Sequence, residues 1–176
     1  NHSDQDNSKK RFPPETPCNY ENYYGTLNSF FDKIKYLTGL SIYISSHPRA
    51  KYIKNPYNFG KLFHNKTFEL INHKKCKLVF IHSSLAINHA LIKNKPIIFL
   101  TQNHFTYSNK KSINDLASYF NNSPLNMSDK TINIETLNKC KILQPYAFKE
   151  YKKNYVSEHK FKNKSYEIIY KSLFKK

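Results

Sequence analysis

Two short apolar runs within residues 41–101 constrain the fold of this chain more than any other feature. Each run ends in a polar cluster led by histidine: His47-Pro48-Arg49 after residues 41–45, and His82-Ser83-Ser84 after residues 78–81. A strand that ends in small polar residues and passes into a helix puts those residues at the carboxyl edge of a sheet. Open α/β folds bind ligands at that edge, and a helix start there favours an anion. The pattern predicts an α/β protein with a phosphate or nucleotide site.

The strand expected at 78–81 is fully apolar, as in a parallel sheet that is covered on both faces. A helix at 84–94 and a strand at 97–100 follow it, which makes one right-handed crossover unit. We expect the runs at 41–45, 78–81 and 97–100 to form one parallel sheet with the second in the centre. Further expected elements are a helix at 20–38 ending at Gly39, a loop at 51–64, helices at 65–72 and 112–120, an edge strand at 131–134, and terminal helices at 146–155 and 164–174.

These elements predict a Rossmann-like, three-layer α/β domain with a short, mostly parallel sheet. At 176 residues and 39% hydrophobic, the chain is long enough to bury one core. We interpret residues 1–19 as a polar leader or linker and 20–176 as a single domain with C-terminal helices. The chain does not begin with Met, so we expect a piece of a longer protein. No apolar run is long enough to span a membrane, and three isolated cysteines are typical of a reducing cytoplasm.

The formal net charge of +17 raises the possibility of nucleic-acid binding. The lysines are scattered along the chain rather than gathered in one arm, and no standard nucleic-acid-binding motif is present. Heavy use of Lys, Asn and Ile is also what an AT-rich coding sequence produces. We therefore expect no nucleic-acid partner, and regard an anionic membrane surface or an anionic substrate as the better match for the charge.

The two polar clusters carry groups suited to phosphate. A histidine can donate to a phosphate oxygen or protonate a leaving group, and Arg49 can pair with phosphate in two-point geometry. The candidate nucleotide- and phosphate-binding residues are His47, Pro48, Arg49, His82, Ser83 and Ser84. The competing interpretations are an ordinary polar loop for the first cluster and a helix cap for the serines, since serine is among the best capping residues.

Glu69 lies between the clusters and could accept both hydroxyls of a ribose. The simpler interpretation is a first-turn glutamate favoured by the helix dipole. The histidines and cysteines show no metal-ligand spacing, and the chain has neither a GxGxxG nor a Walker-type loop. No metal or cofactor is therefore expected, and the absence of those loops argues against dinucleotide-dependent dehydrogenases and P-loop NTPases.

The order His47-Pro48, Glu69, Ser83-Ser84 resembles the donor-binding, C-terminal half of bacterial GT-B-type glycosyltransferases, the sialyltransferase-like group. The surrounding sequence, ELI…LVFIHSSLAINHALIKNKPIIFLT, also resembles a wider group of capsule and surface-polysaccharide transferases. The resemblance covers about residues 27–101. It implies that His47 contacts the nucleotide phosphate and acts as the catalytic acid, that Glu69 holds the ribose, and that Ser83 and Ser84 hold the phosphate.

The resemblance implies a nucleotide-sugar-binding domain, with a CMP-linked sugar as one option for the donor, and a glycan or glycolipid as acceptor. The acidic-Gly motif that carries the base in those families is absent, and it belongs to the N-terminal domain that we expect to be missing. We therefore expect this chain to bind donor without turnover, and the full-length protein to be the enzyme. Its expected location is the cytoplasm, peripheral to the inner face of the bacterial membrane.

Two alternatives remain open. One is another enzyme of related type, either a CDP-glycerol-type polymer transferase or a UDP-sugar epimerase-like protein. The other belongs to a different class, a basic module that binds nucleic acid or an anionic membrane. Selective binding of one nucleotide would favour an enzyme, and affinity for any polyanion that falls steeply with salt would favour the module.

Overall fold

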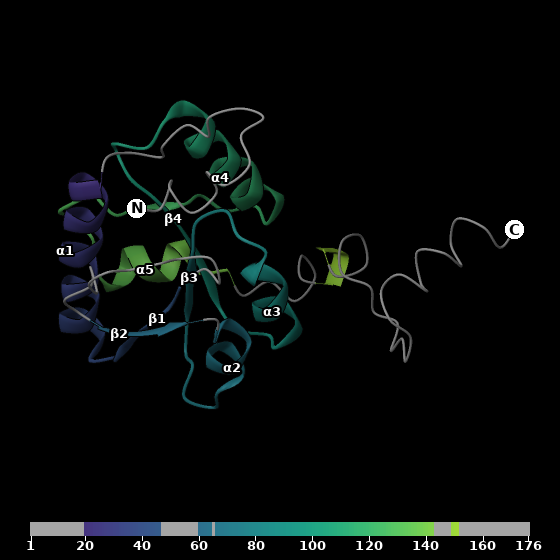
Figure 1. Cartoon of the computed structure of the whole chain (residues 1–176). Helices are drawn as coiled ribbons and strands as arrows, with labels where there is room; N and C mark the ends of the chain where they lie inside the picture. Colours follow the sequence, from purple (N-terminus) through teal and green to yellow (C-terminus); the bar gives the residue numbers. More distant parts are fainter. Residues whose placement is uncertain (1–19, 47–59, 65, 143–148, 152–176) are drawn as a thin grey trace, which may run out of the picture.

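The fold was determined from a computed structural model, which describes residues 20–46, 60–64, 66–142 and 149–151 (Figure 1). These residues form a mixed α/β structure with short parallel sheets. The named elements, in chain order, are α1 (Tyr20–Thr38), β1 (Ile42–Ser46), β2 (Gly60–His64), α2 (Thr67–Asn72), β3 (Val79–Ile81), α3 (Ala86–Ile92), β4 (Ile97–Thr101), α4 (Tyr107–Tyr119), β5 (Leu125–Asn126) and α5 (Ile134–Cys140).

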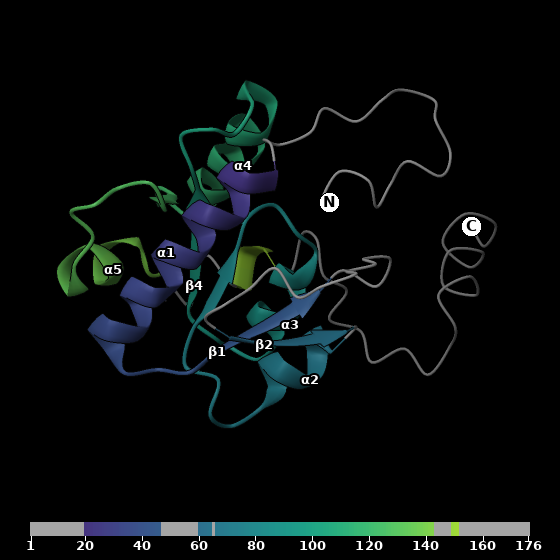
Figure 2. The same cartoon turned by 60° about the vertical axis from the view of Figure 1, so that its left-hand side comes forward.

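The strands pair in two groups rather than one. β1 pairs with β2, and Figure 2 shows this pair side by side with α2 next to it. The second group has the order β3-β4-β5, and every pair in both groups is parallel. The expected strands and their parallel direction are confirmed. The expectation of one sheet with residues 78–81 in the centre is wrong, because β4 occupies the centre of its group.

Residues 60–64 correct a second expectation, since they form β2 and not part of a loop. The segment reads GKLFH, with only two apolar residues and with Pro56 and Gly60 before them. These turn residues outweighed the weak apolar signal. In the structure β2 gains its order from pairing, residue for residue, with the whole of β1.

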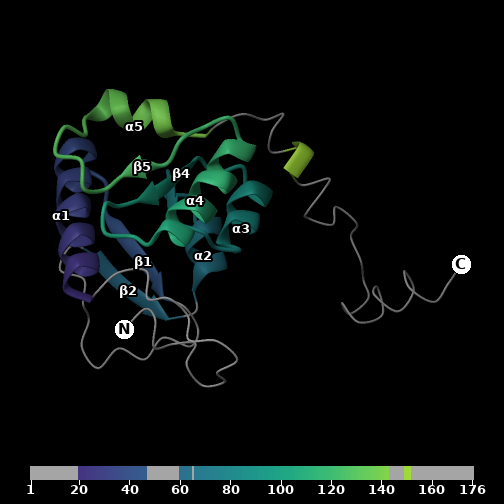
Figure 3. The same cartoon turned by 90° about the horizontal axis from the view of Figure 1, so that it is seen from above.

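The core lies between β4 and the helices that cover it. All four residues from Ile97 to Leu100 are buried. Figure 3 shows α1 and α5 on one side of the strands and α2 and α3 on the other. The buried face of α1 follows helical spacing and consists of Tyr23, Tyr24, Leu27, Phe30, Phe31 and Ile34. Phe30 and Phe31 both meet the Phe80 ring of β3 edge-on.

Helix ends follow the expected chemistry where the sequence supplies it. α1 has the predicted bounds, and Gly39 follows it with a φ of 67°, the left-handed conformation that glycine adopts without strain. Thr106 caps α4 by accepting from the Asn109 N–H, so this helix begins five residues before the expected 112. Asn133 caps α5 in the same way, through the Thr136 N–H.

The expected edge strand at 131–134 is wrong, because Asn133 and Ile134 begin α5 and the short β5 takes the edge position instead. Of the two expected terminal helices, 164–174 lies outside the described residues, and only 149–151 of the other is described. Those three residues are helical, and Tyr151 packs against Phe120 at the end of α4. No helix in the described part of the chain is long and apolar enough to cross a membrane.

Candidate functional site

His82, the first residue after β3, is held by the fold on both sides of its ring. The carbonyl oxygen of Leu100 can only accept, so the Nδ1–H group of His82 donates to it at 2.8 Å. The ring Nε2 forms a hydrogen bond with the Tyr23 hydroxyl at 3.2 Å. The ring also meets Phe105 edge-on. His82 therefore joins α1, β3 and β4, and its ring nitrogens are engaged inside the protein.

Ser83 differs from His82 because its side chain is exposed. Its hydroxyl lies 3.0 Å from the hydroxyl of Ser112 on α4. Two hydroxyls that share one hydrogen bond use only one of their two O–H donors. The pair therefore keeps a donor that can reach an oxygen-rich ligand. It stands just beyond the carboxyl end of β3.

Ser84 serves the start of α3. Its Oγ accepts from the Ala86 N–H at 3.2 Å, and its carbonyl oxygen accepts from the Ile87 N–H. These bonds form a turn directly before the helix, whose N-cap residue is Leu85 and has no side-chain cap hydrogen bond. Ser84 is therefore held in this turn and is not itself the N-cap that the sequence interpretation offered as the alternative to phosphate binding. An accepting hydroxyl oxygen still has its own hydrogen to donate, so this turn leaves the exposed Ser84 hydroxyl able to contact a ligand.

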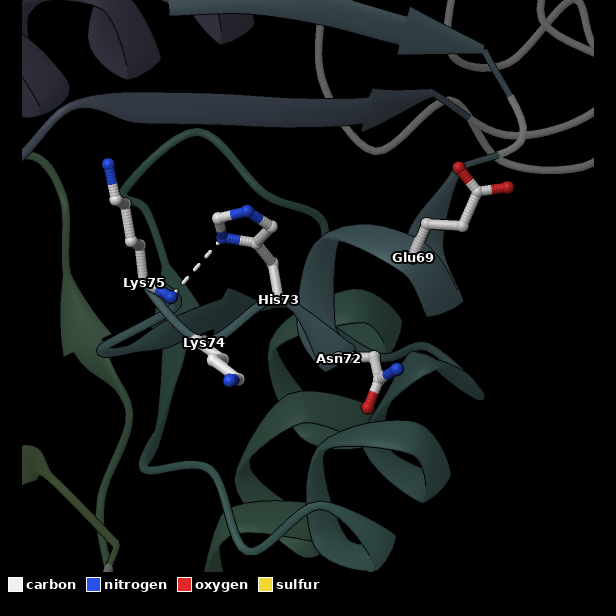
Figure 4. Close-up of a pocket in the computed structure, with 5 residues that line it drawn as sticks. All are labelled: Glu69, Asn72, His73, Lys74 and Lys75. Atoms are coloured by element: carbon white, nitrogen blue, oxygen red, sulfur yellow. Dashed lines mark hydrogen bonds between the residues drawn. The ribbon is translucent and has the colours of Figure 1, made fainter.

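Glu69 lies on the exposed surface of α2 and pairs with Lys66 at 2.7 Å. It also lines an open depression of about 570 Å³, together with Asn72, His73, Lys74 and Lys75. Figure 4 shows Glu69 at one end of this depression and Lys75 at the other. Neither Ser83 nor Ser84 is among the described residues that line it. The assignment of Glu69 to the same cleft as the serines stays a prediction.

The first polar cluster, His47-Pro48-Arg49, lies outside the described residues, as does the expected leader at 1–19. The strand that leads to it ends in Ser45 and Ser46. Ser45 Oγ lies 2.7 Å from the Thr67 hydroxyl at the start of α2, and the buried Ser46 hydroxyl donates to the Phe63 carbonyl. The chain therefore approaches His47 from a position fixed against β2 and α2.

The structure adds polar residues that sequence reasoning missed. At the carboxyl ends of β4 and β5, Asn126 Nδ2 donates to Asn103 Oδ1 at 2.8 Å, and Lys110 Nζ donates to the Asn103 carbonyl at 2.7 Å. With Ser112, they extend the polar edge that begins at Ser83. The polar pair Gln102-Asn103 directly after β4 was a usable signal for Asn103. Nothing in the sequence marked Ser112, which sits in the second turn of a helix.

Titration and metal chemistry add little to this edge. No group of His, Cys, Asp or Glu side chains in the described parts of the chain is arranged to hold a metal ion. Burial raises the pKa of the Cys76 thiol, with Lys95 acting in the opposite direction, and burial also raises the pKa of Cys140. Both thiols are therefore kept protonated, which disfavours a role as nucleophile.

A scan of protein-family models, a search of curated proteins and a search of solved structures each found no match to this chain.

Proposed function

We propose that this chain binds a nucleotide sugar and serves as the donor-binding domain of a GT-B-type glycosyltransferase that makes surface polysaccharide or lipooligosaccharide. The observation that carries the proposal is the exposed hydroxyl pair of Ser83 and Ser112 at the carboxyl end of β3. Parallel strands that end in polar residues supply ligand sites at this edge in open α/β folds. The order of His47-Pro48, Glu69 and Ser83-Ser84 adds the sequence resemblance.

In this proposal the Ser83 and Ser84 hydroxyls donate to phosphate oxygens of the donor. Both hydroxyls are exposed and retain donor capacity beside their internal hydrogen bonds. Glu69 pairs with Lys66 through Oε1, so its second carboxylate oxygen is the one offered to the ribose. His82 acts indirectly, since its bonds to Tyr23 and Leu100 fix the point at which β3 passes into the serines.

The reaction is attack of an acceptor hydroxyl on the anomeric carbon of the sugar. The new glycosidic bond forms as the bond from that carbon to the phosphate oxygen breaks, and the nucleotide leaves with the bonding electrons. His47 donates a proton to the departing phosphate, and a general base takes the proton of the acceptor hydroxyl. We assign no base within this chain, and therefore expect donor binding by the chain without turnover.

The test is a thermal-shift screen of the 176-residue chain against CMP, CDP, UDP, GDP and their sugars. A ligand at 100 times its dissociation constant stabilises the folded state by roughly 2.7 kcal/mol. We expect one nucleotide to raise the melting temperature and Ser83→Ala to weaken that effect without changing the melting temperature of the free protein. Ser118→Ala is the matched control, because it also replaces an exposed serine and lies on α4 outside the Ser83–Ser112 pair. No response to any nucleotide, or equal responses from Ser83→Ala and wild type, would remove the proposal.

The second candidate, a basic module for polyanions, is favoured by the charge. Glu69 is the only acidic residue in the stretch 33–114, although lysine recurs throughout that stretch. Such a module would bind DNA, RNA and heparin alike, with affinity that falls steeply as salt rises. Titration with unrelated polyanions at low and high salt separates this candidate from selective nucleotide binding.

A further inference from the structure

Helix α3 is apolar on two opposite faces. Ile87, Ala90 and Leu91 are buried against the core, as expected for a crossover helix. On the other side Leu85, the N-cap residue of α3, is 81% exposed and Ile92 is 47% exposed. These two positions are seven residues apart, so they share one stripe of the helix, with His89 between them. The exposed stripe contributes nothing to the core and requires a separate explanation.

Helix α2 extends this stripe sideways. α2 packs against α3, and the Phe68 ring meets the His89 ring edge-on with 5.4 Å between centroids. Phe68 is 49% exposed, and Lys93 Nζ lies 5.5 Å from the centre of its ring. We refer to the surface formed by Phe68, Leu85, His89, Ile92 and Lys93 as the α2–α3 face. It combines three large apolar side chains with an amphipathic cation.

The stretch of chain that carries the α2–α3 face is predominantly positive. Glu69 is the only acidic residue between positions 33 and 114, and it is already paired with Lys66. Lys74 and Lys75 follow α2 at the depression, and neither forms an ion pair with another described residue. A partner for this face must therefore accept apolar side chains and carry negative charge. A second copy of the chain fails the charge condition, since it also carries +17.

We propose that the α2–α3 face binds the surface of an anionic lipid bilayer. Phe68, Leu85 and Ile92 insert at the boundary between headgroups and acyl chains, which is where amphipathic helices place their apolar side chains. Lys93 extends from beside the Phe68 ring to the phosphate groups, as long cationic side chains do at membrane interfaces. The surrounding lysines add electrostatic attraction to the anionic leaflet. This role does not depend on the proposed nucleotide binding.

The test is co-sedimentation of the 176-residue chain with vesicles of phosphatidylcholine alone or of phosphatidylcholine mixed with phosphatidylglycerol. We expect binding to the anionic vesicles only. Leu85→Ser/Ile92→Ser should weaken that binding about tenfold or more, because two inserted apolar side chains are lost. Lys93→Gln should weaken it roughly fivefold, the contribution of one cation near the surface. Both substituted apolar residues are exposed, so the variants should melt at the wild-type temperature.

Tyr36→Ser on α1 is the matched control, since that side chain is 89% exposed and lies outside the α2–α3 face. Wild-type binding by the Leu85→Ser/Ile92→Ser variant would overturn the proposal and leave net charge as the cause. Equal loss in the control would also overturn it, because the effect would not be specific to the α2–α3 face. Failure of wild type to bind the anionic vesicles would overturn it directly. Self-association that Leu85→Ser/Ile92→Ser abolishes, without vesicle binding, would assign the face to a second copy. The nucleotide response of the same variants reports separately on the proposed function.

Discussion

β4 and β1 are both five-residue parallel strands, but their side chains lie in opposite surroundings. Residues Ile97 to Leu100 of β4 are buried between helices and neighbouring strands. In β1, Tyr43 is 54% exposed, Ile42 and Ile44 are only half-buried, and the single buried residue is Ser46. β4 therefore forms part of the core, whereas β1 contributes little to it.

The comparison shows how the fold divides stability from the candidate site. The group β3-β4-β5 holds the core together with α1, and its polar edge includes a histidine that is committed to internal hydrogen bonds. The pair β1-β2 and helix α2 carry Glu69 and lead to His47, with little buried surface of their own. Substitutions near β1 and α2 can therefore alter binding at small cost in stability.

The largest expected effect separates the two strands directly. Phe99→Ala removes a buried ring that stacks on Phe120, and should lower the free energy of unfolding by about 3–5 kcal/mol. Tyr43→Ala removes an exposed ring that contacts Phe63, and should cost less than about 1 kcal/mol. Urea denaturation of the two variants measures the difference. Equal losses would show that β1 belongs to the cooperative core after all.

A smaller effect is expected at the polar edge of the buried group. His82→Ala removes the ring that is hydrogen-bonded to the Tyr23 hydroxyl and donates to the Leu100 carbonyl, and should lower the free energy of unfolding by about 2 kcal/mol. Tyr23→Phe should cost about 1 kcal/mol, and the double variant less than the sum, because one hydrogen bond is shared. Unchanged stability in His82→Ala with weakened nucleotide binding would instead make His82 a ligand-contacting residue.

The smallest effect concerns a surface turn of the same region. The N–H and hydroxyl of Thr131 both donate to Asp129 at 2.7 Å and lower the pKa of its carboxyl group. A folded-state pKa below the unfolded value gives stability that is complete above about pH 4 and is lost as the pH falls through the folded pKa. Asp129→Asn should therefore flatten the acid limb of the melting-temperature profile slightly. A change in melting temperature in Asp129→Asn that is larger than the change in Tyr43→Ala would contradict the comparison.

The sequence predicted the elements that have strong local signals. The apolar stripe of α1 and Gly39 set that helix to the residue, and the apolar runs of β3 and β4 stood out against polar flanks. The sequence did not predict β2, because this strand has only two apolar residues and depends on pairing with β1. The strand expected at 131–134 was wrong because Asn133 is a helix N-cap that accepts from the Thr136 N–H, and α5 begins directly after it.

The candidate site was predictable only in its local part. Ser84 could be placed next to a helix start from the sequence, but Leu85 takes the N-cap position, and Ser84 accepts from the Ala86 N–H in the turn before it. The contacts of its two neighbours could not be predicted, since Ser83 meets Ser112 and His82 meets Tyr23, which is 59 positions away. Such pairs arise from the way the elements pack, and no local pattern in a single sequence indicates them.

The contacts of Tyr23 with His82 and Phe105 have a consequence for synthesis of the protein. α1 emerges from the ribosome before the segments it packs on, because Phe30 and Phe31 meet Phe80 of β3 and Tyr23 meets His82 and Phe105. The packing of its aromatic face is complete only when the chain has been extended to Phe105. At roughly 5–20 residues per second, that interval lasts on the order of ten seconds. During this interval the side chains of Tyr23, Phe30 and Phe31 lack some or all of their packing partners. We expect α1 to be the segment that a holding chaperone protects.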